Sequence, residues 1–456
     1  MLNWIWLGLV GMAVLLGAVS GQLAEVTAAA FDACKTAVIT LALPLAGIMA
    51  LWLGIMRLAE KSGLVGVLAR ALQPIMRWLF PDVPPQHPAM GSMVMNMAAN
   101  MLGLANAATP LGLRAMQDLE KLNPRPGVAT NAMCTFLAVN TSSIQLIPAT
   151  TVGILSAAGA ANPTSIIGTA FLATVCSTIA GVTAVKGLEK LPYFSLPAAE
   201  RKIDRRSLGE ETPTEPELLA PLGLGWKIVL GVVLCLFGVL FVTMSFSPHL
   251  FEGMANFVRS FLQIAKPFAF PEEWAGKHWL ARGVEVISLL AIPLILTLFP
   301  AYAAARGIAV YEEFVEGAKE GFQVAVRIIP FLVAILVAVG MFRAAGGVDL
   351  LSRMLSPILQ PLRFPSEPLP LVLMRPLSGS GSNGLFAELV KAHGPDSLIA
   401  RMGGTVMGST ETTFYVIAVY FGSVAIRKTR HAVAAGLIAD LVGVIASVVI
   451  CNFVFR

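Results

Sequence analysis

The sequence predicts an all-α polytopic membrane protein with two inverted-topology repeats, each containing a re-entrant helical hairpin and broken helices. Three observations predict it: an apolar composition, apolar stretches of membrane-spanning length, and the same order of motifs in both halves. Of the 456 residues, 56% are hydrophobic and 13% are charged, whereas soluble domains average about 25% charged residues. The apolar runs are continuous rather than alternating, which argues against a transmembrane β-barrel.

Nine apolar stretches are near the length of about 20 residues that a helix needs to cross a bilayer. They cover residues 2–19, 36–56, 131–156, 164–186, 226–246, 283–304, 322–342, 411–426 and 432–454. We expect the first to be retained as a span, because no Lys or Arg precedes its apolar run, as a signal peptide would require.

The net charge of +5 does not indicate a nucleic-acid partner. The basic residues lie mostly in loops between apolar stretches, as the positive-inside rule predicts for a membrane protein. We therefore expect no nucleic acid to bind.

The chain divides into four segments. We predict an N-terminal repeat at 1–186, a cytoplasmic charged linker at 187–225, an extra span with a polar connection at 226–282, and a C-terminal repeat at 283–456. The linker is dense in both charge signs and contains Pro213 and Pro216, so it is unsuited to lipid.

Two stretches, 88–116 and 369–390, are too polar and glycine-rich for ordinary spans and too apolar for plain loops. Irregular backbone survives at membrane depth only where protein or a water-filled cavity surrounds it. Both stretches are therefore predicted to be re-entrant hairpins. Repeated halves with broken helices are typical of transporters.

Charge favours an inverted arrangement of the two halves. The turn at 157–163 before the last span of the first half has no charged residue, whereas its counterpart at 427–431 has three basic residues and a histidine. The positive-inside rule then places the two turns on opposite sides. Arg353 and Arg363 count against this arrangement, because they would lie on the outer side.

Polar side chains concentrate at matching places in the two halves. Helix ends inside a membrane leave N–H and C=O groups free to hold a ligand, and neighbouring polar side chains extend that surface. The predicted substrate-binding residues are Asn100, Asn106, Thr109, Asn140, Thr141, Ser142, Gln145, Ser378, Ser380, Ser382, Asn383, Thr410, Glu411 and Thr412. The alternative is that these small polar residues only join helices through close packing and hydrogen bonds.

Two carboxylates stand out in the second half. Glu411 begins an apolar stretch with no Lys or Arg beside it, and Asp440 is flanked by apolar residues. Carboxylates inside a membrane are costly, which makes both candidates for ion coupling. Glu411 could instead be an interfacial residue at a helix N-terminus, and Asp440 could form a structural ion pair with Arg375.

Signatures of enzymes and of resident cofactors are missing. The chain has no GxxxxGK[ST] loop, no HExxH and no GxSxG motif, and its cysteines show no metal-ligand spacing. We therefore expect no catalytic residues, no metal site and no cofactor.

Several of these motifs resemble those of the spore maturation proteins A and B. The runs NMLGLANAATPLG (100–112) and NTSSIQLIP (140–148) look like the A protein. The runs RPLSGSG (375–381), HGPD (393–396) and GSTETTFY (408–415) look like the B protein. The resemblance covers nearly the whole chain apart from the linker and the extra span.

The resemblance implies a nucleoside recognition, or gate, domain similar to parts of concentrative nucleoside transporters and of the ferrous-iron transporter. In nucleoside transporters a Thr-Glu pair contacts the base, and Thr410 and Glu411 resemble that pair. A bacterial inner-membrane permease is thus expected, which moves a nucleoside-like solute or an anionic metabolite by alternating access. H⁺ or Na⁺ would be its coupling ion, and a homo-oligomer is left open. The alternative is a non-transporting scaffold of an envelope or spore-maturation complex.

Overall fold

The protein is helical throughout the part that this computed structural model describes. The described residues are 2–103, 105–142, 144–194, 222–264, 270, 274, 277–347, 350 and 365–455, without the side chains of 2–5, 105–107, 324, 325, 327, 328 and 331. The centre of the predicted linker, Arg353, Arg363 and the side chain of Asn106 thus lie outside the described residues.

The elements before the linker include a packed pair of helices and one interrupted helix. They are α1 (Leu2–Ser20), α2 (Leu23–Lys35), the π-helix η1 (Thr36–Ala42), α3 (Leu43–Lys61), α4 (Leu64–Leu79), α5 (Pro88–Met101), α6 (Ala105–Lys121), α7 (Asn131–Thr141), α8 (Ala149–Ala157), α9 (Ile166–Leu188) and the 3-10 turn η2 (Pro192–Phe194).

The elements after the linker follow a similar order. They are α10 (Leu224–Phe246), α11 (Pro248–Phe261), α13 (Trp279–Ala305), α14 (Val310–Ala344), α16 (Leu369–Met374), α17 (Gly379–His393), α18 (Leu398–Ser409), α19 (Thr413–Ser423) and α20 (Ala432–Phe455). In both halves a two-helix segment, an interrupted helix and a long apolar helix follow one another.

Five helical segments among the described residues are long and apolar enough to cross a membrane. They are Leu23–Lys61, which joins α2, η1 and α3, together with α9, α10, α13 and α20; Trp6–Ser20 and Leu332–Ala344 are shorter apolar helices. The prediction of a polytopic helical membrane protein is confirmed. Its predicted spans at 131–156 and 411–426 are instead parts of interrupted helices.

The first long helix contains a π-helical turn just before Pro44. Proline has no N–H to donate and its ring crowds the preceding turn. A wider turn relieves both problems, and the Leu43 N–H here reaches the carbonyl oxygen of Val38, five residues back. The helix therefore continues through the proline to Lys61.

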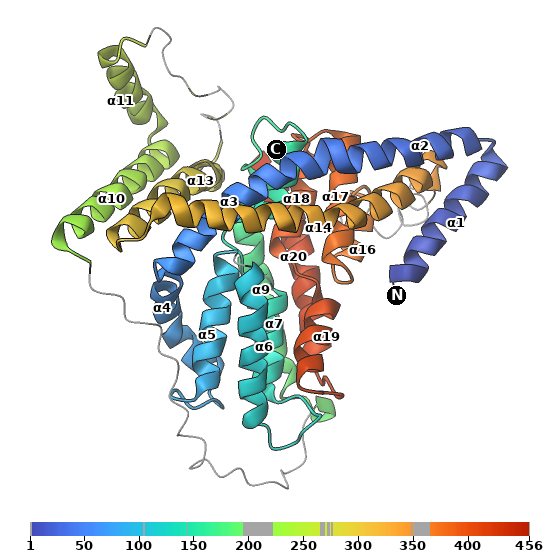
Figure 1. Cartoon of the computed structure of the whole chain (residues 1–456), viewed down its shortest axis with the longest axis horizontal. Helices are drawn as coiled ribbons and strands as arrows, with labels where there is room; N and C mark the ends of the chain where they lie inside the picture. Colours follow the sequence, from blue (N-terminus) through green and yellow to red (C-terminus); the bar gives the residue numbers. More distant parts are fainter. Residues whose placement is uncertain are drawn as a thin grey trace.

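Helices α3 and α14 form a close pair that joins the two halves. At Gly317 an added Cβ would lie 2.5 Å from the carbonyl oxygen of Leu53, and at Gly321 it would meet the backbone of Met49 and Ala50. Small residues four apart allow such close helix approach. In Figure 1 this pair lies across the direction of α9, which runs along α20.

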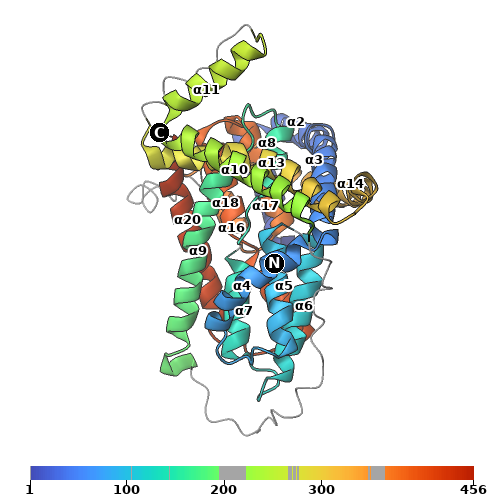
Figure 2. The same cartoon turned by 90° about the vertical axis from the view of Figure 1, so that its left-hand side faces the viewer.

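The core belongs to both halves at once. One continuous cluster of buried apolar side chains includes residues of α3 and α5 from the first half and of α14 and α17 from the second. Helices α10 and α13 pack against each other at one side of this body, and α11 extends from α10 away from it (Figures 1 and 2).

Candidate functional site

The helix of the first half is interrupted between Thr141 and Ala149. The side chains of Asn140, Thr141 and Ser142 donate hydrogen bonds to carbonyl oxygens of the preceding turn, at 2.9–3.1 Å. Pro148, directly before α8, lacks an N–H to continue the helical pattern. Short polar side chains thus satisfy the last turn of α7 where the backbone stops.

The helix of the second half is interrupted between Ser409 and Thr413. Thr410 has an extended backbone (φ −134°, ψ 159°), and its hydroxyl donates to the carbonyl oxygen of Val406 at 2.8 Å. The second interruption therefore has the same cause as the first. A hydroxyl side chain bonds the final turn of the helix in place of the next backbone amide.

The two interruptions lie beside each other. Helix α7 packs against α19 and α8 packs against α18, so the two interrupted helices run side by side in opposite directions. Both reach the same glycine of α20: a Cβ on Gly436 would lie 2.8 Å from Cγ2 of Thr413 and 3.2 Å from Oγ1 of Thr141. The two polar clusters predicted from the sequence therefore meet at one place in the fold.

Each two-helix segment touches the interruption of its own half. In the first half, which contains the packed pair α5 and α6, the Leu146 N–H donates to the carbonyl oxygen of Met101 at 3.0 Å. In the second half the Phe414 N–H donates to the carbonyl oxygen of Pro376, also at 3.0 Å. The same backbone contact thus recurs in both halves.

A chain of amide side chains runs through the first half of the site. Nδ2 of Asn100 donates to Oδ1 of Asn140 at 2.9 Å and lies 3.4 Å from Oδ1 of Asn96. Asn96 is fully buried, and its Nδ2 donates to the carbonyl oxygen of Ala108 at 2.7 Å and lies 3.5 Å from the hydroxyl of Tyr420. These amide side chains thus link α5 and α6 to α7 and to α19.

A buried arginine organises the second half of the site. The guanidinium of Arg375 donates to the carbonyl oxygen of Met407 at 3.0 Å, and also to the carbonyl oxygen of Thr410. It forms an ion pair with Glu411, with Nη2 and Oε2 3.8 Å apart. Arg375 therefore binds the carbonyl groups that the end of α18 exposes, and its carboxylate partner is Glu411.

Asp440 faces the same interruption from α20. Its Oδ2 accepts a hydrogen bond of 2.6 Å from the hydroxyl of Thr413, the first residue of α19. The sequence suggested an ion pair between Asp440 and Arg375. The structure instead shows an ion pair of Arg375 with Glu411 and a hydrogen bond from Thr413 to Asp440.

Some predicted site residues serve the helix ends themselves. Ser378 caps α17 by accepting a hydrogen bond from the Gly381 N–H at 3.0 Å, and Ser382 donates to the carbonyl oxygen of Ser378 at 2.7 Å. Ser380, Asn383, Thr109 and Gln145 are half-buried near these segments, whereas Thr412 is buried beside Gly379.

Sequence reasoning missed the contributions of α9 and α19. The Thr174 hydroxyl donates to the carbonyl oxygen of Ser142 at 2.8 Å, and the Ser177 hydroxyl donates to that of Ala439 at 2.9 Å. Both lie on the buried face of an apolar helix. In α9, two hydroxyl residues three positions apart on one helix face were the sequence signal for this contribution. In α19, the signal was a tyrosine, Tyr420, inside an apolar stretch.

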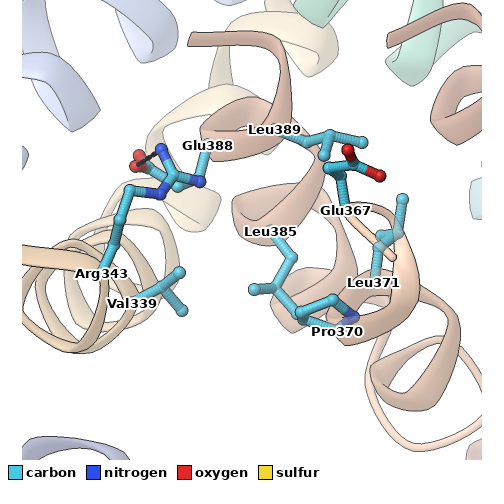
Figure 3. Close-up of a pocket in the computed structure, with 8 residues that line it drawn as sticks. All are labelled: Val339, Arg343, Glu367, Pro370, Leu371, Leu385, Glu388 and Leu389. Atoms are coloured by element: carbon cyan, nitrogen blue, oxygen red, sulfur yellow. Dashed lines mark ion pairs between the residues drawn. The ribbon is translucent and has the colours of Figure 1, made fainter. Parts of the chain in front are cut away.

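A separate pocket lies between α14 and the α16–α17 segment (Figure 3). An ion pair between Arg343 and Glu388, with Nη1 and Oε1 2.7 Å apart, closes one side, and Glu367 lies on the other. None of the residues lining this pocket was among the predicted binding residues, so it is distinct from the helix interruptions.

Comparisons with known proteins agree with this architecture. Residues 42–187 and 325–427, more than half of the chain, match the Gate family, described as nucleoside recognition. The chain is 43% identical to spore maturation protein B of Bacillus subtilis (strain 168) over 172 residues, which cover 38% of this chain and 97% of that protein.

A second relative matches equally well. The chain is 43% identical to spore maturation protein A of Bacillus subtilis (strain 168) over 182 residues, which cover 40% of this chain and 92% of that protein. No solved structure matches. The resemblance noted in the sequence is confirmed, and the chain belongs to the Gate nucleoside recognition family of membrane proteins, with similarity to spore maturation proteins A and B within one polypeptide.

Proposed function

We propose that this protein is a permease of the bacterial inner membrane that moves a small polar solute by alternating access. The observation that carries the proposal is the meeting of two interrupted helices, each in contact with a two-helix segment of its own half. Helix ends inside a membrane protein present oriented N–H and C=O groups that water does not satisfy. Such a place can hold a polar ligand.

The opposite directions of α7–α8 and α18–α19 support an inverted repeat. In transporters built this way, substrate sites lie where the repeats meet, and one repeat rocks against the other. The packed pair α5–α6 and the α16–α17 segment supply the re-entrant hairpins of this proposal.

The proposed solute is nucleoside-like or an anionic metabolite. Asn100, Asn140 and Thr410 offer neutral donors and acceptors of the kind that bind sugar hydroxyls and base edges. Thr410 and Glu411 also resemble the Thr-Glu pair that contacts the base in nucleoside transporters. Arg375 supplies a positive charge close by. The family description, nucleoside recognition, agrees with the first solute class.

A binding assay followed by an uptake assay tests the proposal. Purified protein is heated with nucleosides or with anionic metabolites, because a ligand that binds only the folded state raises the melting temperature. Ligands that stabilise the protein are then tested for uptake into proteoliposomes.

Variants locate the site in the same assays. Thr410→Val and Asn100→Ala should lose stabilisation and uptake. Thr297→Val serves as the control, because Thr297 is exposed and bonds only its own helix. Ligand stabilisation that survives both site variants would place binding elsewhere in the protein.

One observation favours the scaffold alternative. Helix α11 exposes Leu250, Phe257 and Phe261, with 65–81% of each residue accessible. A scaffold should require this surface, whereas a permease should require the helix interruptions. Alanine replacements in α11 and at Asn100 and Thr410, scored against the same cellular phenotype, would separate the two functions.

A further inference from the structure

Asp440 is a buried carboxylate with one oxygen left unbonded. The residue is 6% exposed within the apolar span α20. Thr413 donates to its Oδ2 and the backbone N–H of Glu411 also approaches the carboxylate, whereas its Oδ1 makes no hydrogen bond of ordinary geometry to any described residue. A buried carboxylate oxygen without a donor is costly in protein, and more so inside a membrane.

The charges around Asp440 do not balance. Among the residues that the structure describes, the charged groups within electrostatic reach are Arg375 and Glu411, while α7 and α9 bring hydroxyl groups to this part of α20. Arg375 is already held by Glu411 and by two carbonyl oxygens. An ionised Asp440 would therefore leave one uncompensated negative charge in the protein interior, which requires one positive charge in return.

We propose that Asp440 takes up and releases a single proton, so that the coupling ion of this protein is H⁺ and its site is Asp440 rather than Glu411. The coupling rests on the proposed permease function, whereas proton binding at Asp440 does not. Glu411 instead remains paired with Arg375 beside the helix interruption.

The surrounding oxygens favour a proton over Na⁺. Hard metal cations need several oxygen ligands at once. Here the carbonyl oxygens of Met407 and Thr410 accept hydrogen bonds from Arg375, and that of Ala439 accepts one from Ser177. Among the described residues no group of three or more Asp, Glu, His or Cys side chains could hold a metal ion. A proton needs only Oδ1.

The position of Asp440 connects the proton to the helix interruption. Gly436 and Gly443 flank Asp440 on the same face of α20 and let Thr413 and Thr410 approach closely. The bond from Thr413 ties the first residue of α19 to α20. Proton uptake neutralises the acceptor of this bond and therefore weakens the tie between α19 and α20.

Infrared difference spectroscopy of the purified protein tests the proton site without a substrate. In potassium buffer at neutral pH, the wild-type protein should show the C=O stretching band of a protonated carboxylic acid, and raising the pH should remove it. Asp440→Asn should lose the band, while Glu411→Gln should keep it. Thr413→Val should shift it, because the hydrogen-bond partner of Asp440 is lost.

Two results would overturn the inference. One is a band that persists unchanged in Asp440→Asn, provided that the variant still unfolds cooperatively on heating. The other is a band that disappears when Na⁺ replaces K⁺ at constant pH, which would assign the site to Na⁺. Loss of the proton site would leave the permease proposal standing, whereas a confirmed proton site without uptake of any solute would refute transport alone.

Discussion

At the scale of single residues, hydrogen bonds between side chains hold the candidate site together. Asn100 and Asn140 connect α5 to α7 through one amide–amide hydrogen bond of 2.9 Å. The Nδ2 of Asn140 is used within its own helix. Asn100 therefore supplies the donor that the Oδ1 of Asn140 uses, and its removal leaves a half-satisfied buried amide.

Asn100→Ala should lower the free energy of unfolding by about 1–2 kcal/mol, because the Asn140 oxygen loses its donor. The control is Asn162→Ala, where the exposed side chain accepts a bond from Thr164 two residues away; it should change stability by less than about 0.5 kcal/mol. Thermal unfolding of both variants in one detergent provides the comparison. Equal melting temperatures would contradict a structural role for the amide pair.

His431 lies directly before α20 and gives the protein a dependence on pH. Its imidazole is fully buried against Phe194, and neither ring nitrogen has a hydrogen-bond partner among the described residues. Burial, followed by the nearby positive charges of Arg430 and Lys186, lowers the pKa of His431 to about 4. A histidine in the unfolded chain has a pKa of about 6.5.

The unfolded chain therefore binds this proton first, and stability should fall as the pH drops from about 6.5 towards 4. His431→Phe should flatten this part of the curve of melting temperature against pH. His249→Phe, which removes an exposed histidine, is the control. The same slope in the wild type and in His431→Phe would exclude His431 as the cause.

At the scale of elements, the positions of helices follow from the sequence and their interruptions only in part. The spans predicted at 164–186, 226–246 and 432–454 match α9, α10 and α20 within two residues, because each is a continuous apolar run. The polar, glycine-rich stretches at 88–116 and 369–390 likewise correspond to the two-helix segments α5–α6 and α16–α17. That these segments are re-entrant hairpins stays a prediction. The helix break after Thr141 was not predicted, because hydrogen bonds from side chains to the backbone have no distinctive sequence pattern.

Other elements were misjudged because of their charges. Helix α14 begins at Val310, although its first turns contain Glu312, Glu313 and Glu316. Hydropathy favoured a start at 322, whereas Arg57 on α3 bonds Glu313 at 2.7 Å and so accommodates charge there. Helix α18, the first part of the second interrupted helix, was not predicted as part of a span, since it is short and contains Arg401.

The close contact of α3 with α14 leads to a test at the same scale. Alanine favours a helix over glycine by up to about 1 kcal/mol, so Gly238→Ala on α10, where an added Cβ meets nothing within 4 Å, should keep or raise the melting temperature. Gly317→Ala should lower stability by about 1–3 kcal/mol, because its Cβ meets the Leu53 carbonyl. Matching effects of the two substitutions would contradict close packing of this pair.

At the scale of the whole molecule, neither half is complete. The pairs α3–α14, α9–α20, α7–α19 and α8–α18 each join one half to the other, and the main apolar core is shared. The sequence predicted two similar halves and their internal order. It could not predict that the two polar clusters lie together, because that depends on packing between residues more than 250 positions apart, such as Thr141 and Thr413.

A chain cut between residues 195 and 221 should still assemble when both fragments are produced together. Each fragment alone should be poorly recovered, because its helix in each of these four pairs lacks a partner. Co-purification through a tag on one fragment, followed by thermal unfolding, measures this. Stable, monodisperse fragments produced singly would contradict the shared core.

The bond between Arg57 and Glu313 joins positions 256 residues apart. During synthesis, α3 therefore leaves the ribosome long before its partner α14 has been made. Until then the face of α3 that contacts α14 has no packing partner from α14. Premature termination anywhere before residue 310 would yield a fragment with that face uncovered. A growing chain can therefore cover its earliest helices only after synthesis has passed α14, which ends at Ala344.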